Sequence, residues 1–154
     1  MSHTTFPISL ARKILCFVPV PIMVRGTEIV MALIKKRHPK LFKNMAALDS
    51  AWVCLDPTDI PFQFVLRMGE GASFSLYTGG RDSFDATIAG DLEALIDMLE
   101  GRADGDALFF ARRLKITGNT ETVVALRNTL DREEIVLRDE ICAALGPFGD
   151  YLKA

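Results

Sequence analysis

Few side chains of this sequence have the types and spacing that catalysis or metal binding requires. The two histidines, His3 and His38, lie near the N-terminus and beside a proline that is predicted to end a helix, so they cannot form a histidine-centred triad or a multi-histidine metal site. The sequence has no GxSxG or HExxH motif, and the Gly-Glu-Gly segment 69–71 lacks the third glycine of a dinucleotide-binding fingerprint. Asp56 and Asp59 offer a carboxylate-only mechanism, but the Asp-Pro-Thr-Asp sequence that they bound is typical of a turn. The sequence therefore predicts a protein that is not an enzyme and that uses no cofactor or metal.

The cysteines and the charge balance argue against further classes of protein. Cys16, Cys54 and Cys142 are odd in number, far apart and without a CxxC pair, which argues against a disulfide framework and against a zinc or iron–sulfur site. We interpret them as small buried hydrophobic residues in a reducing compartment, and we expect a cytoplasmic protein. The net charge of −2 and the pI of about 5.7 provide no basic field of the kind that drives non-specific nucleic-acid binding. Nucleic acid is therefore not an expected partner.

Two adjacent cations stand out. Arg112 and Arg113 directly follow the pair Phe109-Phe110, so a guanidinium could lie at the mouth of an apolar pocket and contact a phosphate or an aromatic head group. In the alternative interpretation they are a solvated pair that binds Asp104 or Asp106. The sequence leaves both interpretations open.

An apolar N-terminal segment, residues 1–25, precedes a single expected domain of residues 26–154. Pro19 and Pro21 interrupt the segment, and its apolar run is too short to span a bilayer, which takes about 20 apolar residues. It could lie in a membrane interface, pack on the domain, or contact a second copy of the chain. The residues that suggest these contacts are Phe6, Ile8, Leu10, Ile14, Leu15 and Phe17, together with Arg12 and Lys13.

The period of the apolar residues predicts an α+β domain. It changes from near four to two after residue 50, and the cleanest alternation runs from Phe62 to Met68. Thr27, Asp91 and Asp131 are predicted N-caps, and segment 69–71 is a predicted hairpin turn. The predicted helices cover residues 27–37, 39–45, 92–99, 120–130 and 131–145. The predicted strands cover residues 52–55, 62–68, 74–79, 86–89 and 114–117. The expected fold is a mostly antiparallel sheet of about five strands, with helices covering one face.

Two segments resemble the sterol carrier protein type 2 (SCP-2) lipid-binding family. They are residues 52–64, WVCLDPTDIPFQF, and residues 104–120, which contain LFFARRLKITGNT. The second segment is most similar to a bacterial branch of ubiquinone biosynthesis accessory factors. Arg112-Arg113 stands where many relatives carry a glycine-lysine pair, which favours this branch and puts sterol specificity in doubt. The resemblance implies an apolar cavity between sheet and helices, no catalytic residues, and association with separate hydroxylases of ubiquinone synthesis.

Apolar side chains of the sheet and helices are the expected cavity walls. They are Phe62, Phe64, Leu66, Met68, Phe74, Leu76, Ile88, Leu92, Leu95, Ile96, Leu99, Phe109, Phe110, Leu114 and Leu126. The pattern alone favours a solid core, and only the resemblance favours a cavity. The expected ligand is a polyprenylated quinone precursor. The alternatives are a general phospholipid or fatty-acyl carrier, and an interaction subunit with an apolar groove that docks a partner's helix.

Overall fold

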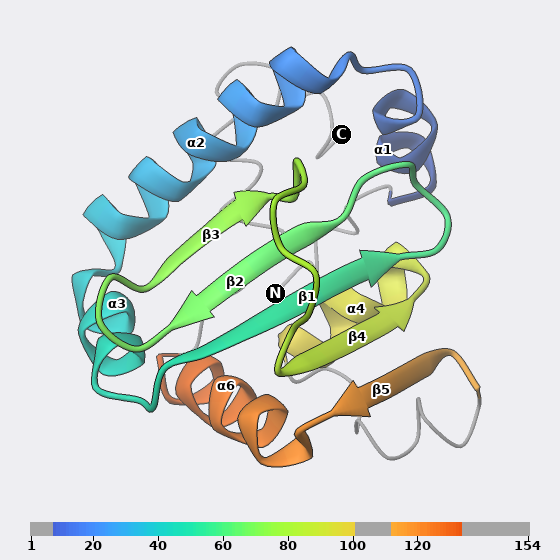
Figure 1. Cartoon of the computed structure of the whole chain (residues 1–154). Coiled ribbons are helices and arrows are strands. Elements are labelled where there is room, and N and C mark those ends of the chain that lie inside the picture. The colour runs from blue at the N-terminus through green and yellow to red at the C-terminus, as the bar shows by residue number, and fades with distance from the viewer. Residues whose placement is uncertain (1–7, 101–111, 134–154) are drawn as a thin grey trace, which may run out of the picture.

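A five-stranded β-sheet organises the part of the chain that the computed structural model describes, residues 8–100 and 112–133 (Figure 1). The spatial order of the strands is β3-β2-β1-β4-β5. Only the pairing of β1 with β4 is parallel, and the other three pairings are antiparallel, as predicted. The strands are β1 (Ala51–Pro57), β2 (Phe64–Met68), β3 (Ser73–Leu76), β4 (Ala86–Gly90) and β5 (Leu114–Gly118).

The strand register places the large apolar side chains on one face of the sheet. Val53 of β1 lies opposite Leu66 of β2 and Ala86 of β4, and Ile88 of β4 lies opposite Ile116 of β5. Because successive side chains of a strand point to opposite faces, these pairs define an inner, apolar face. The alternation predicted from Phe62 to Met68 holds within β2, although Phe62 itself precedes the strand.

Helices cover the inner face, as the sequence predicted. Figure 1 shows α4 and α6 behind the sheet and α2 along the side of β3. The main core joins side chains of the sheet to α3, α4 and α6, and Val53, Ile88 and Leu126 at its centre are inaccessible to solvent. The helices are α1 (Ile8–Leu15), α2 (Val20–Arg37), α3 (Pro39–Ala46), α4 (Leu92–Leu99) and α6 (Thr120–Arg132).

The start of α2 was predicted wrongly. Thr27 is not an N-cap but lies buried inside the helix, where its hydroxyl donates to the Met23 carbonyl at 2.8 Å. The helix begins at Val20, with Pro19 at the N-cap and Pro21 in the first turn. Proline is tolerated there because the first backbone N–H groups of a helix have no partner inside it. The helix therefore runs continuously across the boundary that was drawn between residues 25 and 26.

Other element boundaries also differ, among them the end of β3, which lies at Leu76 instead of residue 79. Asp131 is not an N-cap, because it lies in the last turn of α6, and the predicted final helix falls from residue 134 onwards outside the described residues. Asp56 and Pro57 belong to β1, since they pair with Ala89 and Gly90 of β4. The turn that they were predicted to open therefore begins after Pro57, and β2 starts at Phe64 instead of Phe62.

The outer face of the sheet is covered by a connection between strands. Figure 1 shows the segment from β3 to β4 passing in front of β2 and β1. Arg81 in this segment lies over the Trp52 ring, with 4.0 Å between its guanidinium carbon and the ring centroid, and Arg67 lies over the same ring at 5.4 Å. Cys54 and Val65 also point to this outer face and are buried there.

Candidate functional site

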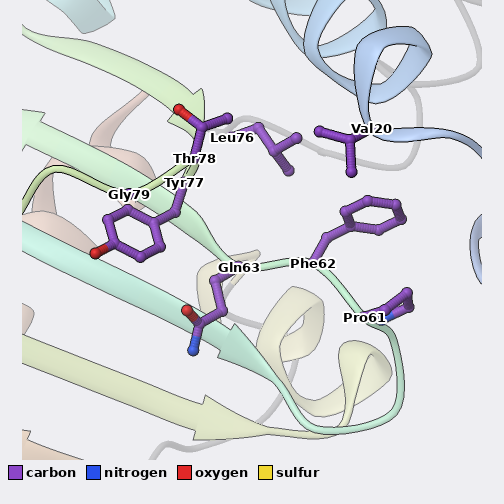
Figure 2. Close-up of a pocket in the computed structure, with 8 residues that line it drawn as sticks. All are labelled: Val20, Pro61, Phe62, Gln63, Leu76, Tyr77, Thr78 and Gly79. Carbon is purple, nitrogen blue, oxygen red and sulfur yellow. The ribbon is translucent and has the colours of Figure 1, made fainter.

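A pocket of about 460 Å³ lies between the N-terminal end of α2 and the end of β3 (Figure 2). Its volume is within the range of roughly 300–1,000 Å³ that is usual for small-molecule sites. Figure 2 shows Val20, Phe62 and Leu76 turned towards a common space, which makes this end of the pocket apolar. Gln63 and Tyr77 bring polar groups to the other end. The full lining consists of Val20, Pro61, Phe62, Gln63, Leu76, Tyr77, Thr78 and Gly79.

The apolar floor of the pocket continues into the protein. Phe62 and Leu76 form a buried cluster with Ile60, and part-buried side chains of α1, α2 and α4 pack against this cluster. Phe64 contacts both this cluster and the main core, and its ring stacks on Phe74 with centroids 5.4 Å apart. Packed apolar side chains therefore continue from the pocket into the core between the sheet and the helices.

The fifteen predicted wall residues fall into distinct groups. Two of them, Phe62 and Leu76, line the pocket, whereas Phe109 and Phe110 lie outside the described residues. Leu92 packs against the smaller cluster and Ile96 is buried on α4. The others contribute to the main core: Phe64, Leu66, Met68, Phe74, Ile88, Leu95, Leu99, Leu114 and Leu126. As described, these side chains pack against one another as a hydrophobic core, and their contact with a lipid stays a prediction.

Sequence reasoning missed six of the pocket residues. They are Val20, Pro61, Gln63, Tyr77, Thr78 and Gly79. Pro21 in the first turn of α2 was the available signal for Val20, because proline is common at the start of helices. The other five lie in segments next to strand ends, where side-chain periodicity carries no information about long-range neighbours.

Arg113 is held by an acidic residue, but not by one of those considered from the sequence. Its guanidinium donates to both carboxylate oxygens of Asp91, at 2.9 and 3.3 Å. Asp91 is also the N-cap of α4, as predicted, and accepts the Ala94 N–H at 2.8 Å. Partial burial raises the pKa of Asp91, but the bonds from Arg113 and Ala94 and the guanidinium charge outweigh this effect and lower the pKa below its ordinary value. Arg113 therefore orders the junction between β5 and α4.

The Asp91–Arg113 pair predicts a pH-dependent contribution to stability. Replacing Asp91 with asparagine keeps a capping oxygen but removes the ion pair, which should cost about 0.5–1 kcal/mol at neutral pH because both groups are partly exposed. A carboxylate with a lowered pKa in the folded state stabilises the fold above its unfolded-state pKa of about 3.9. The free energy of unfolding of the wild type should therefore approach that of Asp91→Asn as the pH falls through about 3.9 towards the folded-state pKa. Urea denaturation between about pH 7 and pH 3 measures both free energies.

The matched control is Asp82→Asn at an exposed carboxylate in the β3–β4 connection. It should follow the wild-type stability curve over the same pH range. A difference in the free energy of unfolding between the wild type and Asp91→Asn that stays constant at every pH would contradict an ionic contribution.

The other side chains that could do chemistry, two cysteines and Asp59, show no arrangement for catalysis in the described residues. Burial, with the nearby Asp56 charge, raises the pKa of the Cys54 thiol and keeps it protonated. Cys16 is exposed, so its prediction as a buried residue was wrong.

Asp59 accepts the Leu92 N–H at 3.0 Å and pairs with Arg12 at 3.4 Å. Within residues 8–100 and 112–133, no three histidine, cysteine, aspartate or glutamate side chains are grouped closely enough to hold a metal ion.

The described helices are also too short or too polar to cross a membrane. α2 is the longest of them, with 18 residues, and it carries basic side chains in its last turn. None of the helices in this part of the chain combines the length and the hydropathy of a membrane span.

Comparisons with known proteins agree with this architecture. Residues 31–131 match the SCP-2 sterol transfer family. The ubiquinone biosynthesis accessory factor UbiT of Escherichia coli K12 is 28% identical over 88 residues, which are 57% of this chain and 49% of UbiT. UbiT of Escherichia coli O157:H7 matches to the same extent, so the chain spans about half the length of the curated relatives that it matches.

Solved structures support the same fold. The UbiJ-SCP2 ubiquinone synthesis protein aligns with a TM-score of 0.57 at 18% identity, over 74% of this chain and 97% of that protein. The apo form of sterol carrier protein 2 from Yarrowia lipolytica aligns with a TM-score of 0.51 at 12% identity, over 70% of this chain and 88% of that protein. Because the family match extends over well more than half of the sequence and the sheet and helices align with solved members, this chain belongs to the SCP-2 sterol transfer family.

Proposed function

We propose that this protein holds an isoprenoid quinone precursor and presents its aromatic head to the hydroxylases of ubiquinone biosynthesis. The observation that carries the proposal is the pocket whose floor, Phe62 and Leu76, continues through Phe64 into the apolar interior. The similarity to UbiT, a ubiquinone biosynthesis accessory factor, supports the choice of ligand. In this proposal the protein binds and presents its ligand, and it makes and breaks no bond.

Burial of hydrocarbon supplies the affinity. Each methylene that leaves water gains about 0.8 kcal/mol, so several prenyl carbons offset the cost of ordering the ligand without any hydrogen bond. The main core includes Met45, Met68 and Met98, whose unbranched side chains adapt to irregular shapes. We propose that the tail enters by the pocket and that these side chains rearrange around it between the sheet and the helices.

Of the two arginines, Arg112 is the one outside the Asp91 ion pair, and we propose it as the head-group contact. Both arginines are exposed, but the backbone φ of Arg112, 59°, is in the left-handed region, which is uncommon for a residue other than glycine. Arg112→Gly should leave the free energy of unfolding unchanged or raise it by up to about 1 kcal/mol, because glycine adopts this conformation without strain. The same variant should lose selectivity for ligands with a polar head, as measured by competition between quinone precursors and head-less prenyl lipids.

Arg112→Gln separates charge from conformation, because it removes the guanidinium and keeps the strained backbone. Both variants should lose head-group selectivity to the same extent. Unchanged selectivity in both would remove Arg112 from the site.

Organic extraction and mass spectrometry of the protein purified from its own host test the proposed function directly. The expected result is a prenylated aromatic precursor in the extract. A phospholipid or fatty acid as the main component would favour a general carrier instead. An empty protein that co-purifies with a partner protein in its groove would contradict lipid carriage.

A further inference from the structure

The β3–β4 connection, residues 77–85, is hydrogen-bonded to the sheet only near its two ends. The backbone N–H groups of Tyr77 and Asp85 donate to the carbonyls of Gln63 and Trp52, at 2.8 and 2.9 Å. The residues between these two points make no backbone–backbone hydrogen bond with the rest of the described chain. A segment that is tied down at so few points opens locally at a lower free-energy cost than the core strands beside it.

A single side chain fastens the middle of this connection to the sheet. The guanidinium of Arg81 lies 4.0 Å from the centroid of the Trp52 ring. Among the described residues, this is the one hydrogen bond, ion pair or ring contact that joins residues 78–84 to a strand. Two further bonds stay within the connection, since the Tyr77 hydroxyl donates to the Arg81 carbonyl at 2.7 Å and Arg81 donates to the Ser83 carbonyl at 3.2 Å. We call the contact of Arg81 with Trp52 the latch.

The same connection forms one wall of the pocket. Tyr77, Thr78 and Gly79 line the pocket, and Figure 2 shows them across from Val20. The Tyr77 hydroxyl is bonded to the carbonyl of Arg81, so the position of this wall depends on the latch. Contacts on the outer face of the sheet are thereby linked to the polar end of the pocket.

Two consecutive glycines lie between the pocket wall and the latch. Gly79 and Gly80 have φ values of 102° and 89°, and nothing lies within 4 Å of a Cβ added at either position. Glycine moves between left-handed and other backbone conformations without steric cost. A few such residues are sufficient as the hinge of a loop that closes over a ligand site.

We propose that the β3–β4 connection is a gate for the pocket, hinged at Gly79 and Gly80 and held closed by the latch. Breaking the latch frees the Tyr77 ring and widens the polar end of the pocket. Ligand enters and leaves while the connection is open, so the strength of the latch sets both rates. The gate rests on the function proposed above only in that the pocket is the entrance for an apolar ligand.

Stopped-flow fluorescence with cis-parinaric acid, a fluorescent fatty acid, tests the gate on the full chain. Arg81→Gln should speed both the binding and the release of this probe about threefold or more, because loss of the cation–π contact raises the population of the open connection. The Kd should stay within about twofold of the wild-type value, because both rates change together. Arg81→Lys keeps a cation over the Trp52 ring and should restore rates close to those of the wild type.

Two further variants control for charge and for the identity of the contact. Arg132→Gln removes the same charge from an exposed position on α6 and should leave both rates unchanged. Trp52→Leu removes the other half of the latch. The double variant Arg81→Gln/Trp52→Leu should be no faster than either single variant, because both substitutions break the same contact.

Three outcomes would overturn the gate. Wild-type rates in Arg81→Gln would mean that the connection does not limit entry. A weaker Kd with an unchanged association rate would make the connection a fixed wall of the pocket. A wild type that binds no probe would exclude the pocket as an entrance. Faster rates in Arg81→Gln, combined with purified protein that carries no prenyl lipid, would support the gate and contradict only the function proposed above.

Discussion

Replacement of Leu76 by tryptophan is expected to lower the amount of lipid that co-purifies with the protein by about tenfold or more. The Leu76 side chain is turned into the apolar end of the pocket beside Val20 and Phe62 (Figure 2), so an indole there takes the space of the ligand. Displacing as few as two methylene groups of a bound tail costs about 1.6 kcal/mol, which corresponds to more than tenfold in affinity. The measurement is the molar ratio of extracted lipid to protein.

Leu76→Met is the matched control at the same position. Methionine conserves the volume of leucine, so this variant should keep its lipid, whereas the tryptophan should also cost about 1–3 kcal/mol of stability through overpacking. Urea denaturation shows whether both variants are folded at the temperature of purification. A folded Leu76→Trp protein with the wild-type lipid content would place the ligand elsewhere.

The sheet could be predicted from sequence because its signals are local. The alternation in β2 assigns Leu66 and Met68 to one face of the strand, and the register confirms that they lie opposite Val53 and Ala51. The predicted turn after Met68 is confirmed by Gly69 and Gly71, whose φ values of 92° and 76° are in the region that favours glycine. Asp91 was also identified correctly, since a capping aspartate precedes the apolar face of its helix.

The site was less accessible to sequence reasoning because it depends on long-range packing. Phe62 and Leu76 were named as wall residues on the basis of strand alternation and family resemblance, but nothing local indicated that Val20 would lie beside them. Pro19 and Pro21 were interpreted as interruptions, although they begin α2 and fix the position of Val20. Arg113 was considered with acidic residues near it in sequence, whereas Asp91, its partner in the fold, is 22 residues away.

Gly118→Ala is expected to destabilise the protein by about 3 kcal/mol or more. Gly118 ends β5 with a φ of 89°, which costs an L-residue roughly 1–2 kcal/mol. An added Cβ would also overlap the Asp85 carbonyl oxygen and lie 3.0 Å from the Ala86 Cα, and both are backbone atoms that cannot move aside. The Asp85 carbonyl already accepts the Asn119 N–H at 2.8 Å, so relieving the overlap would also break the N-terminal connection of α6. Equilibrium unfolding in urea measures the loss.

Gly80→Ala separates the two costs, because Gly80 has the same φ of 89° but no atom within 4 Å of an added Cβ. This variant should lose only the conformational part, about 1–2 kcal/mol. The difference between the two variants then measures the steric part, which exists only if β5 pairs with β4 in the register that places Gly118 opposite Ala86. Equal losses in Gly118→Ala and Gly80→Ala would contradict that register. The same register also matters for the proposed ligand site, because it brings Leu114 and Ile116 into the apolar surface that is proposed to receive the lipid tail.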